Sequence, residues 1–176
     1  ATILKNLRLA LGGVTDIGVI NAGGQQIAYS GPYSLEGRNY SDQQWFKEAM
    51  TRGTFISEVF MGFRNAPHFV IAVRHETPDQ SFFILRISID TGRLNEQLSG
   101  FELSDQGNAF IVNTGGILQT PSRGHEKMFE KIDFPVPAYS DKTEAAQYHT
   151  SADGDYILGF AYIPDSPFIL MIVNKT

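Results

Sequence analysis

The spacing of hydrophobic and polar residues changes several times in the first half of the chain. Each change marks the start of a new secondary-structure element. Short runs in which apolar and polar residues alternate predict strands, and one segment with apolar residues three and four positions apart predicts a helix. The order is strand, strand, helix and three strands, over residues 16–21, 25–30, 41–53, 55–62, 68–75 and 82–89. Because short turns join the last three strands, we expect an antiparallel sheet with the helix covering one face.

The predicted helix carries signals at both ends. Ser41 and Gln44 have the spacing of a capping box at its start, and Gly53 is placed to end it. Its apolar face contains Trp45, Phe46, Ala49 and Met50. A loop rich in Gly, Pro and Ser, residues 31–40, precedes the helix. We expect a pocket between helix and sheet, with this loop as its lid.

Two segments of the first half recur in the second half in the same order. Val19–Gly24 recurs as Ile111–Gly116, and each copy contains an Asn-x-Gly-Gly turn between apolar residues. Ser81–Ile87 recurs as Ser166–Ile172, with five of seven positions identical. Asn and Gly in such turns are typical of β-hairpins, and self-similarity at similar offsets indicates a repeated architecture. The sequence therefore predicts two related lobes.

The repeat sets the expected domain boundaries. Residues 1–13 have apolar residues at helical spacing, and we expect them to be the end of a longer N-terminal helix. The first lobe is expected over residues 14–98 and the second over residues 99–176, with a short helix or linker over residues 91–104 at the join. The expected fold class is α+β, in which each lobe has a five-stranded antiparallel sheet with flanking helices.

The second lobe is expected to keep only part of the repeat. Its first hairpin and its last two strands, residues 156–163 and 168–173, match those of the first lobe. Its middle, residues 122–151, contains Pro135, Pro137 and many polar residues, so the equivalent of the pocket helix is degenerate there. This composition favours a spacer over a second ligand site.

Composition and charge narrow the function. Of 176 residues, 42% are hydrophobic, 19% charged and 12% aromatic, which is typical of a folded domain. A net charge of −5 without a basic cluster argues against a nucleic-acid surface. The chain has no cysteine, and its longest apolar run, Phe168–Val173, is far shorter than the ~20 residues of a membrane helix. Small molecules or proteins are the expected partners.

Motifs for catalysis and cofactors are missing from the sequence. The four histidines lack metal-ligand spacing, the Gly-Gly pairs are not part of a phosphate-binding loop, and there is no serine nucleophile elbow. We therefore expect no catalytic residues, no metal and no cofactor. A hydrolase with an Asp–His pair is the enzymatic alternative, and it requires those groups within hydrogen-bond reach in a cleft.

The chain resembles a known family along nearly its whole length. The segments that carry the resemblance are Tyr40–Ala49, Ile56–Phe60, Pro67–Val73, Asn108–Asn113, Leu118–Ser122 and Ser166–Met171. The first three look like the membrane-distal half of a double Cache (PAS-like) extracytoplasmic sensor domain. The others look like the membrane-proximal half of such a domain in bacterial membrane-bound sensor histidine kinases.

The resemblance implies a ligand-sensing module in the periplasmic or extracellular portion of an inner-membrane receptor, between two transmembrane helices outside this sequence. It also implies a homodimeric receptor, a small-molecule ligand in the distal lobe and a histidine kinase as the output. The alternatives are a chemoreceptor, a diguanylate cyclase receptor, and a module that docks a periplasmic binding protein. A large exposed apolar patch without an enclosed pocket would favour docking.

Eight residues are candidates for ligand binding, because the helix and the neighbouring strands are expected to bring them to one pocket. They are Gln43, Trp45, Phe46, Phe60, Arg64, His68, Arg86 and Ser88. Arg86 interrupts an apolar run, so it lies either on a solvated face or opposite an acid of the ligand. Arg64 and His68 lie either at the pocket mouth or in a solvated turn, and Trp45 is either core or ligand contact.

The resemblance also bears on the chemistry of the ligand. Amino-acid-binding members of the family carry an Arg two positions before the helix Trp, a Tyr just after it, and a Tyr and an Asp on the following strand. The corresponding residues here are Gln43, Phe46, Phe60 and Gly62. The remaining charged candidates are all basic, namely Arg64, His68, Arg74 and Arg86. We expect a small organic anion such as a carboxylate rather than an amino acid, whose two charges would lack partners.

Overall fold

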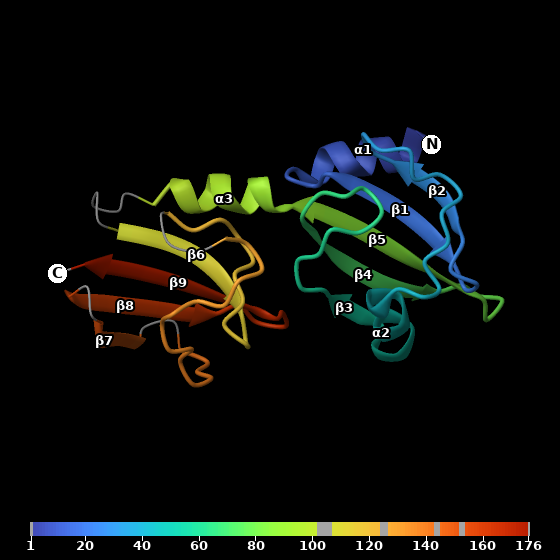
Figure 1. Cartoon of the computed structure of the whole chain (residues 1–176). Helices are drawn as coiled ribbons and strands as arrows, with labels where there is room; N and C mark the ends of the chain where they lie inside the picture. The colour runs from blue at the N-terminus through green and yellow to red at the C-terminus, as the bar shows by residue number, and fades with distance from the viewer. Residues whose placement is uncertain (1, 102–106, 124–126, 143–144, 152–153, 176) are drawn as a thin grey trace. The chain divides into compact units, whose positions relative to one another are not determined.

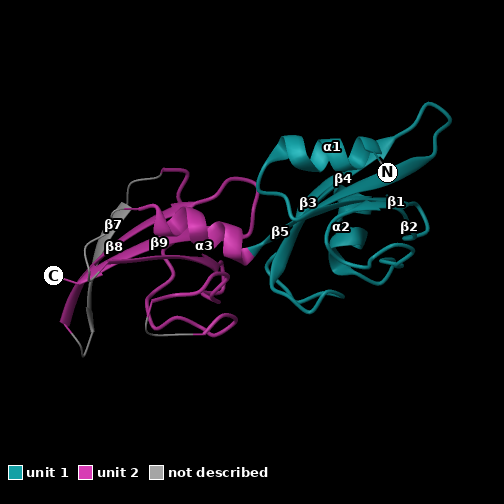
Figure 2. Ribbon diagram, turned by 90° about the horizontal axis from the view of Figure 1, so that it is seen from above, with its two compact units in different colours: residues 1–90 teal, residues 91–176 magenta. Residues whose placement is uncertain are grey.

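The chain forms two compact units, residues 1–90 and residues 91–176 (Figure 2). The computed structural model describes residues 2–101, 107–123, 127–142 and 154–175, and the backbone of residues 145–151. The division falls earlier than the boundary expected after residue 98. In the described part, no helix is both long and apolar enough to cross a membrane.

The first unit is a five-stranded antiparallel sheet with one helix on each face (Figure 1). Its elements are α1 (Thr2–Leu11), β1 (Asp16–Asn21), β2 (Gln26–Ser30), α2 (Gln44–Arg52), β3 (Thr54–Ile56), β4 (His68–Glu76) and β5 (Phe82–Asp90). The strand order is β2-β1-β5-β4-β3, so β5 lies at the centre of the sheet. Helix α1 contacts β1 and β2, and α2 contacts β3, β4 and β5. The antiparallel sheet expected for this half is confirmed.

The expected strand over residues 55–62 is mostly loop. Only β3 is regular, and Phe60 then meets His68 in a single isolated bridge. The loop that follows turns at Asn65, whose N–H bonds to the carbonyl oxygen of Gly62 at 3.3 Å. The prediction of a long strand is therefore wrong, because the ladder with β4 ends at Ile56 and an isolated bridge at Phe60 follows it.

Helix α2 begins without the predicted capping box. Its N-cap is Gln43, and no side chain caps the first turn. Ser41 instead donates from its backbone N and from Oγ to Oδ1 of Asn39, at 2.9 and 2.6 Å. Gly53 ends the helix as expected, with a φ of 83° that favours glycine. The side chain of Gln43 is consequently not used in capping.

The second unit is a four-stranded antiparallel sheet packed against a helix. Its elements are α3 (Thr91–Ser99), β6 (Gly107–Asn113), β7 (Ala145–Ser151), β8 (Gly154–Tyr162) and β9 (Phe168–Lys175), in the strand order β6-β9-β8-β7. The described residues of this unit form four strands and not the expected five. The described residues between β6 and β7 make only isolated bridges, from Leu118 to Val112 and from Ile117 to Lys131. The described residues between β6 and β7 contain no helix.

The two sheets repeat the same connectivity. The order β1-β5-β4-β3 in one corresponds to β6-β9-β8-β7 in the other. The turn after the first strand is repeated in atomic detail. Oδ1 of Asn21 accepts the N–H groups two and four residues later, both at 3.0 Å, and Oδ1 of Asn113 accepts the equivalent groups at 3.0 and 2.8 Å. The recurrence in the sequence is thus a recurrence of structure.

Each unit has its own hydrophobic core. That of the first unit consists of Ile20, Tyr40, Trp45, Phe46, Ala49, Val70, Ala72 and Ile84. That of the second consists of Phe110, Val112, Leu118, Ile132, Leu158, Phe160, Ile169, Met171 and Val173. Leu118 and Ile132 come from the segment between β6 and β7 and belong to the core on one face of the second sheet. Apolar side chains therefore cover this face of the second sheet.

Candidate ligand-binding site

A small cavity lies on the α2 side of the first sheet. Its walls are Leu35, Tyr40, Gln43, Trp45, Phe60, Gly62, Phe63, Arg64, His68 and Arg86. Six of the eight candidates are thus brought together: Gln43, Trp45, Phe60, Arg64, His68 and Arg86. The cavity measures about 10 Å³, which is room for about one water molecule. A larger ligand requires some of these side chains to move.

The other two candidates, and Arg74, lie outside the cavity walls. Phe46 is buried and packs edge-on against Trp45, with 6.2 Å between the ring centroids. Ser88 is fully buried on β5, between β1 and β4. Arg74 donates to the carbonyl oxygen of Met50 near the end of α2, at 2.5 Å, so it stabilises the helix terminus.

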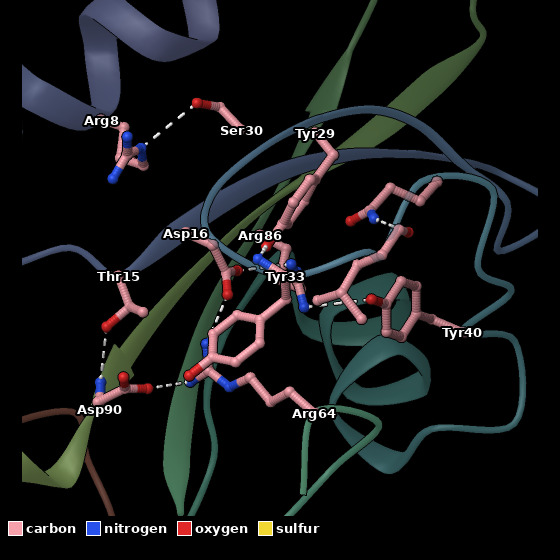
Figure 3. A network of polar contacts seen from close by, with 12 residues as sticks. Arg8, Thr15, Asp16, Tyr29, Ser30, Tyr33, Tyr40, Arg64, Arg86 and Asp90 are labelled. Atoms are coloured by element: carbon pink, nitrogen blue, oxygen red, sulfur yellow. Dashed lines mark hydrogen bonds and ion pairs between the residues drawn. The ribbon is translucent and has the colours of Figure 1, made fainter. Parts of the chain in front are cut away.

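Arg86 lies between small residues on the central strand. Its neighbours on the adjacent strands are Gly18 and Ala72, which leave room for its long side chain. The side chain is 3% exposed, and Nη2 donates to Oδ1 of Asp16 at 2.7 Å (Figure 3). Nη1 donates to the hydroxyl of Tyr40 at 3.3 Å. The solvated alternative for Arg86 is therefore wrong, and its acidic partner belongs to the chain itself.

Arg64 is held by two carboxylates although it lies in a loop. Nη1 donates to Oδ2 of Asp16 and Nη2 to Oδ1 of Asp90, each at 2.5 Å (Figure 3). The guanidinium also lies 5.0 Å from the ring centroid of Tyr33. Its side chain is 1% exposed, so the solvated-turn alternative is wrong. Arg64 ties its loop to the start of β1 and to the end of β5.

Asp16 joins both arginines, and sequence reasoning missed it. The carboxylate is fully buried and places one oxygen on each guanidinium. Together with Asp90 it sets two negative charges against two positive ones, so the formal charges of this cluster cancel. The anionic ligand was expected from the basic residues alone, without Asp16 and Asp90, which neutralise Arg64 and Arg86. Alternation along β1 was the available signal, because it places Asp16 on the same face as the core residue Ile20.

Aromatic side chains of the loop 31–40 cover the two arginines. Tyr33 lies over Arg64, and Tyr40 lies over Arg86 with 5.1 Å from Cζ to the ring centroid. Phe63, in the same loop as Arg64, meets Tyr40 at 5.5 Å between ring centroids. Burial raises the pKa of the Tyr40 hydroxyl, so Tyr40 stays neutral beside Arg86. Two loops thus meet over the cavity through ring and cation–π contacts.

His68 is a neutral wall of the cavity and not a basic one. Nδ1 lies 2.7 Å from the carbonyl oxygen of Ala66, so this nitrogen carries the proton and Nε2 is left as an acceptor. Burial lowers its pKa to about 4, and the charge of Arg64 acts in the same direction. The ring lies close to Gly62, where a Cβ atom would be 2.6 Å from Cε1. The solvated-turn alternative is wrong for His68 as well, because the residue is 3% exposed.

Several buried polar atoms around the arginines lack a partner among the described residues. They are Oε1 of Gln26, Nε of Arg64, Nε of Arg86 and Oγ of Ser88. Leaving such a group unpaired costs about 1–3 kcal/mol. Two of these atoms are guanidinium donors on residues that line the cavity. Two of the residues that line the cavity therefore each carry a buried donor without a partner among the described residues.

The second unit has apolar residues at the corresponding positions. By the offsets of the repeat, Phe110 corresponds to Gly18 and Met171 to Arg86, and both belong to the second core. A separate concavity of about 450 Å³ lies beside α3, and none of the residues that line it is charged. Its walls are Leu94, Gln97, Leu98, Gly100, Phe101, Ile111, Ile163 and Leu170.

Comparisons with known proteins identify the fold. No protein-family model matches this sequence, and the search of curated proteins also finds no match. The structure is similar to the extracellular domain of rpHK1S-Z16, described as a histidine kinase, with a TM-score of 0.79 and 17% identity over 99% of this chain and 76% of that one.

Two further solved structures are similar. One is an extracellular ligand-binding receptor from Desulfohalobium retbaense, with a TM-score of 0.77 and 11% identity over 99% of this chain and 32% of that one. The other is the ligand-binding domain of the Pseudomonas aeruginosa amino acid chemoreceptor PctB in complex with L-Arg, with a TM-score of 0.75 and 13% identity over 99% of this chain and 71% of that one. The chain therefore has the fold of the Cache-type sensor domains of bacterial receptors.

Proposed function

We propose that this chain is the extracytoplasmic sensor domain of a bacterial transmembrane receptor, and that it binds a small organic ligand in the cavity of the first unit. The observation that carries the proposal is the convergence of six predicted residues, two of them buried arginines, on one cavity beneath two loops. The similar structures are receptor domains of the same fold, and their names describe extracellular or ligand-binding domains.

We further propose that the ligand presents a carboxylate or a similar oxygen-bearing group to Arg64 and Arg86. Both guanidinium groups have an unpaired Nε donor, and a planar guanidinium can pair with a carboxylate through two parallel bonds. The walls formed by Trp45 and Phe60 suit a small apolar remainder. The receptor acts as a homodimer in this proposal, and the bound ligand shifts the unit to a state with higher affinity for it.

A sensor histidine kinase and a chemoreceptor are the two candidate outputs. The similar structures include domains of both kinds, so the fold is compatible with either output. Docking of a periplasmic binding protein is the weaker alternative, because the first unit offers a cavity with buried charged walls.

A thermal-shift and calorimetric screen tests the proposal. Acetate, succinate and other simple carboxylates are compared with the common amino acids on the wild-type chain. We expect a carboxylate to raise the melting temperature. We expect Gln43→Ala to weaken its binding by about threefold to tenfold, since Gln43 lines the cavity and one lost hydrogen bond between its amide and the ligand is worth about 0.5–1.5 kcal/mol. Trp45 is unsuitable for this test because it is part of the core.

Gln44→Ala is the matched control, since Gln44 is the exposed neighbour of Gln43 on the same helix. It should leave binding unchanged. If an amino acid binds tightly and simple carboxylates do not, the proposed ligand class is wrong while the sensor function stands. If no compound of either class binds, the proposed function itself fails.

A further inference from the structure

The end of β5 places a carboxylate on the guanidinium that the proposed ligand would use. We infer that Asp90 is an internal anion that occupies Arg64, and that a ligand carboxylate displaces it. This inference rests on the proposed function and adds the internal group with which the ligand competes. It makes Asp90 a residue that determines affinity for carboxylates.

The geometry of Arg64 shows why displacement is favourable. In a guanidinium, Nε and Nη2 lie on the same edge and can hold one carboxylate through two bonds. Asp90 uses only Nη2, at 2.5 Å, and leaves Nε without a partner. A ligand carboxylate would pair with both atoms. The exchange therefore replaces one hydrogen bond with two and satisfies a buried donor.

Burial decides which aspartate leaves. The side chain of Asp16 is 0% exposed and lies between both arginines, so its release would leave uncompensated buried charges. The side chain of Asp90 is 31% exposed and makes one ion pair. Asp90 can turn towards water while its backbone N–H stays bonded to Oγ1 of Thr15 at 3.1 Å.

The balance of charge leads to the same exchange. The two arginines and two aspartates are balanced, so an added anion gives an excess negative charge unless a carboxylate leaves the cluster. The cavity of about 10 Å³ cannot hold a carboxylate ligand beside the existing side chains. Release of Asp90 restores the balance of charge, while the space must come from movement of the residues that line the cavity, and Asp90 is not one of them.

The position of Asp90 gives the exchange a consequence for signalling. Asp90 is the last residue of β5 and of the first unit, and Thr91 begins α3. Arg64 connects this strand end to a loop over the cavity. Ligand binding would therefore release the contact that ties the loop to the strand end from which the chain continues into α3.

The test is calorimetry of acetate and succinate binding to the wild-type chain and to Asp90→Asn. The amide keeps the shape and the hydrogen-bond acceptor but removes the competing charge. We expect at least about fivefold tighter binding of the carboxylate, because the competing ion pair is more buried than surface pairs worth up to about fivefold. We also expect faster amide hydrogen exchange in residues 61–66 of the ligand-free variant, a readout that needs no ligand.

Asp42→Asn is the matched control, since it changes the net charge equally at an exposed position in the same unit. It should leave both the affinity and the exchange unchanged. If the wild type binds a carboxylate and Asp90→Asn binds it no more tightly than Asp42→Asn does, the inference is wrong while the proposed function stands. If neither carboxylates nor amino acids bind to any of the chains, the proposed function fails and the inference falls with it.

Discussion

Asp16 allows two arginines to lie inside a unit of this size. Each guanidinium would be costly to bury alone, and the carboxylate serves both because each of its oxygens accepts from a different arginine. Small neighbours are the second condition, since Gly18 and Ala72 flank Arg86. A Cβ atom at Gly18 would lie 2.1 Å from Oε1 of Gln26 and 3.5 Å from Nε of Arg86. The polar site thus depends on residue size as well as on charge.

His68 predicts a specific pH dependence of stability. Its pKa in the folded chain is about 4, below the ordinary value of 6.5, so the unfolded chain binds more protons in this interval. Stability is therefore complete above pH 6.5 and is lost as the pH falls towards 4. We expect this residue alone to lower the free energy of unfolding by about 2 kcal/mol between pH 7 and pH 5.

Urea unfolding of the wild type and His68→Gln at pH 7, 6 and 5 measures this effect. The variant should show a smaller loss of stability in acid, whatever its stability at pH 7. His75→Gln, at an exposed position on the same strand, should keep the wild-type slope. Equal slopes for the wild type and His68→Gln would contradict the assignment of His68 as a buried neutral group.

At the scale of elements, the repeated turn shows how a local signal determines a hairpin. In both copies one Asn oxygen accepts two backbone N–H groups that the strands leave unpaired. At helix α2, in contrast, the local signal in the sequence did not predict the observed capping contacts. Its capping box was predicted from spacing alone, but Ser41 bonds to Asn39 and the helix begins one residue after Gln43.

The turns give a matched pair of stability predictions. Asn21→Ala should lower the free energy of unfolding of the first unit by about 1–2 kcal/mol, because two backbone donors lose their acceptor. Asn113→Ala should have a similar effect on the second unit. Asn21→Asp keeps the acceptor oxygen and should retain most of the stability. Thermal unfolding of the variants measures these differences, and an Asn21→Ala chain as stable as the wild type would contradict the role of the turn.

At the scale of the molecule, one architecture appears twice with different contents. Where the second unit has the core residues Phe110 and Met171, the first unit has the small Gly18 and the charged Arg86. Large apolar side chains at these positions fill the space that a ligand would need.

The hydrogen bonding of the first sheet predicts that this unit folds by itself. All five strands of this sheet lie within residues 1–90, and α1 and α2 pack on these strands. A chain shortened to end at Asp90 should unfold in one cooperative transition, measured by circular dichroism during heating. A gradual loss of signal without a transition would show that the second unit is required.

The sequence alone predicted those features that depend on residues close to one another along the chain. Alternation located β1, β4 and β5, the turn residues located the first hairpin, and the repeat indicated two related sheets. The sequence also predicted six of the residues that line the cavity. Strand alternation accounts for His68 and Arg86, and the apolar face of α2 accounts for Trp45.

Only the tertiary structure decided the charges of the site and the number of strands in each sheet. Asp16 meets Arg64 and Arg86 across 48 and 70 positions of the sequence, and Arg64 meets Asp90 across 26. Periodicity describes residues within one element and contains no information about such partners. Strand pairing is also a contact between distant segments, so the segment after β6 could look like a strand and still form only isolated bridges. The sequence predicted six of the ten residues that line the cavity, and the folded sheet determined which charges they meet there.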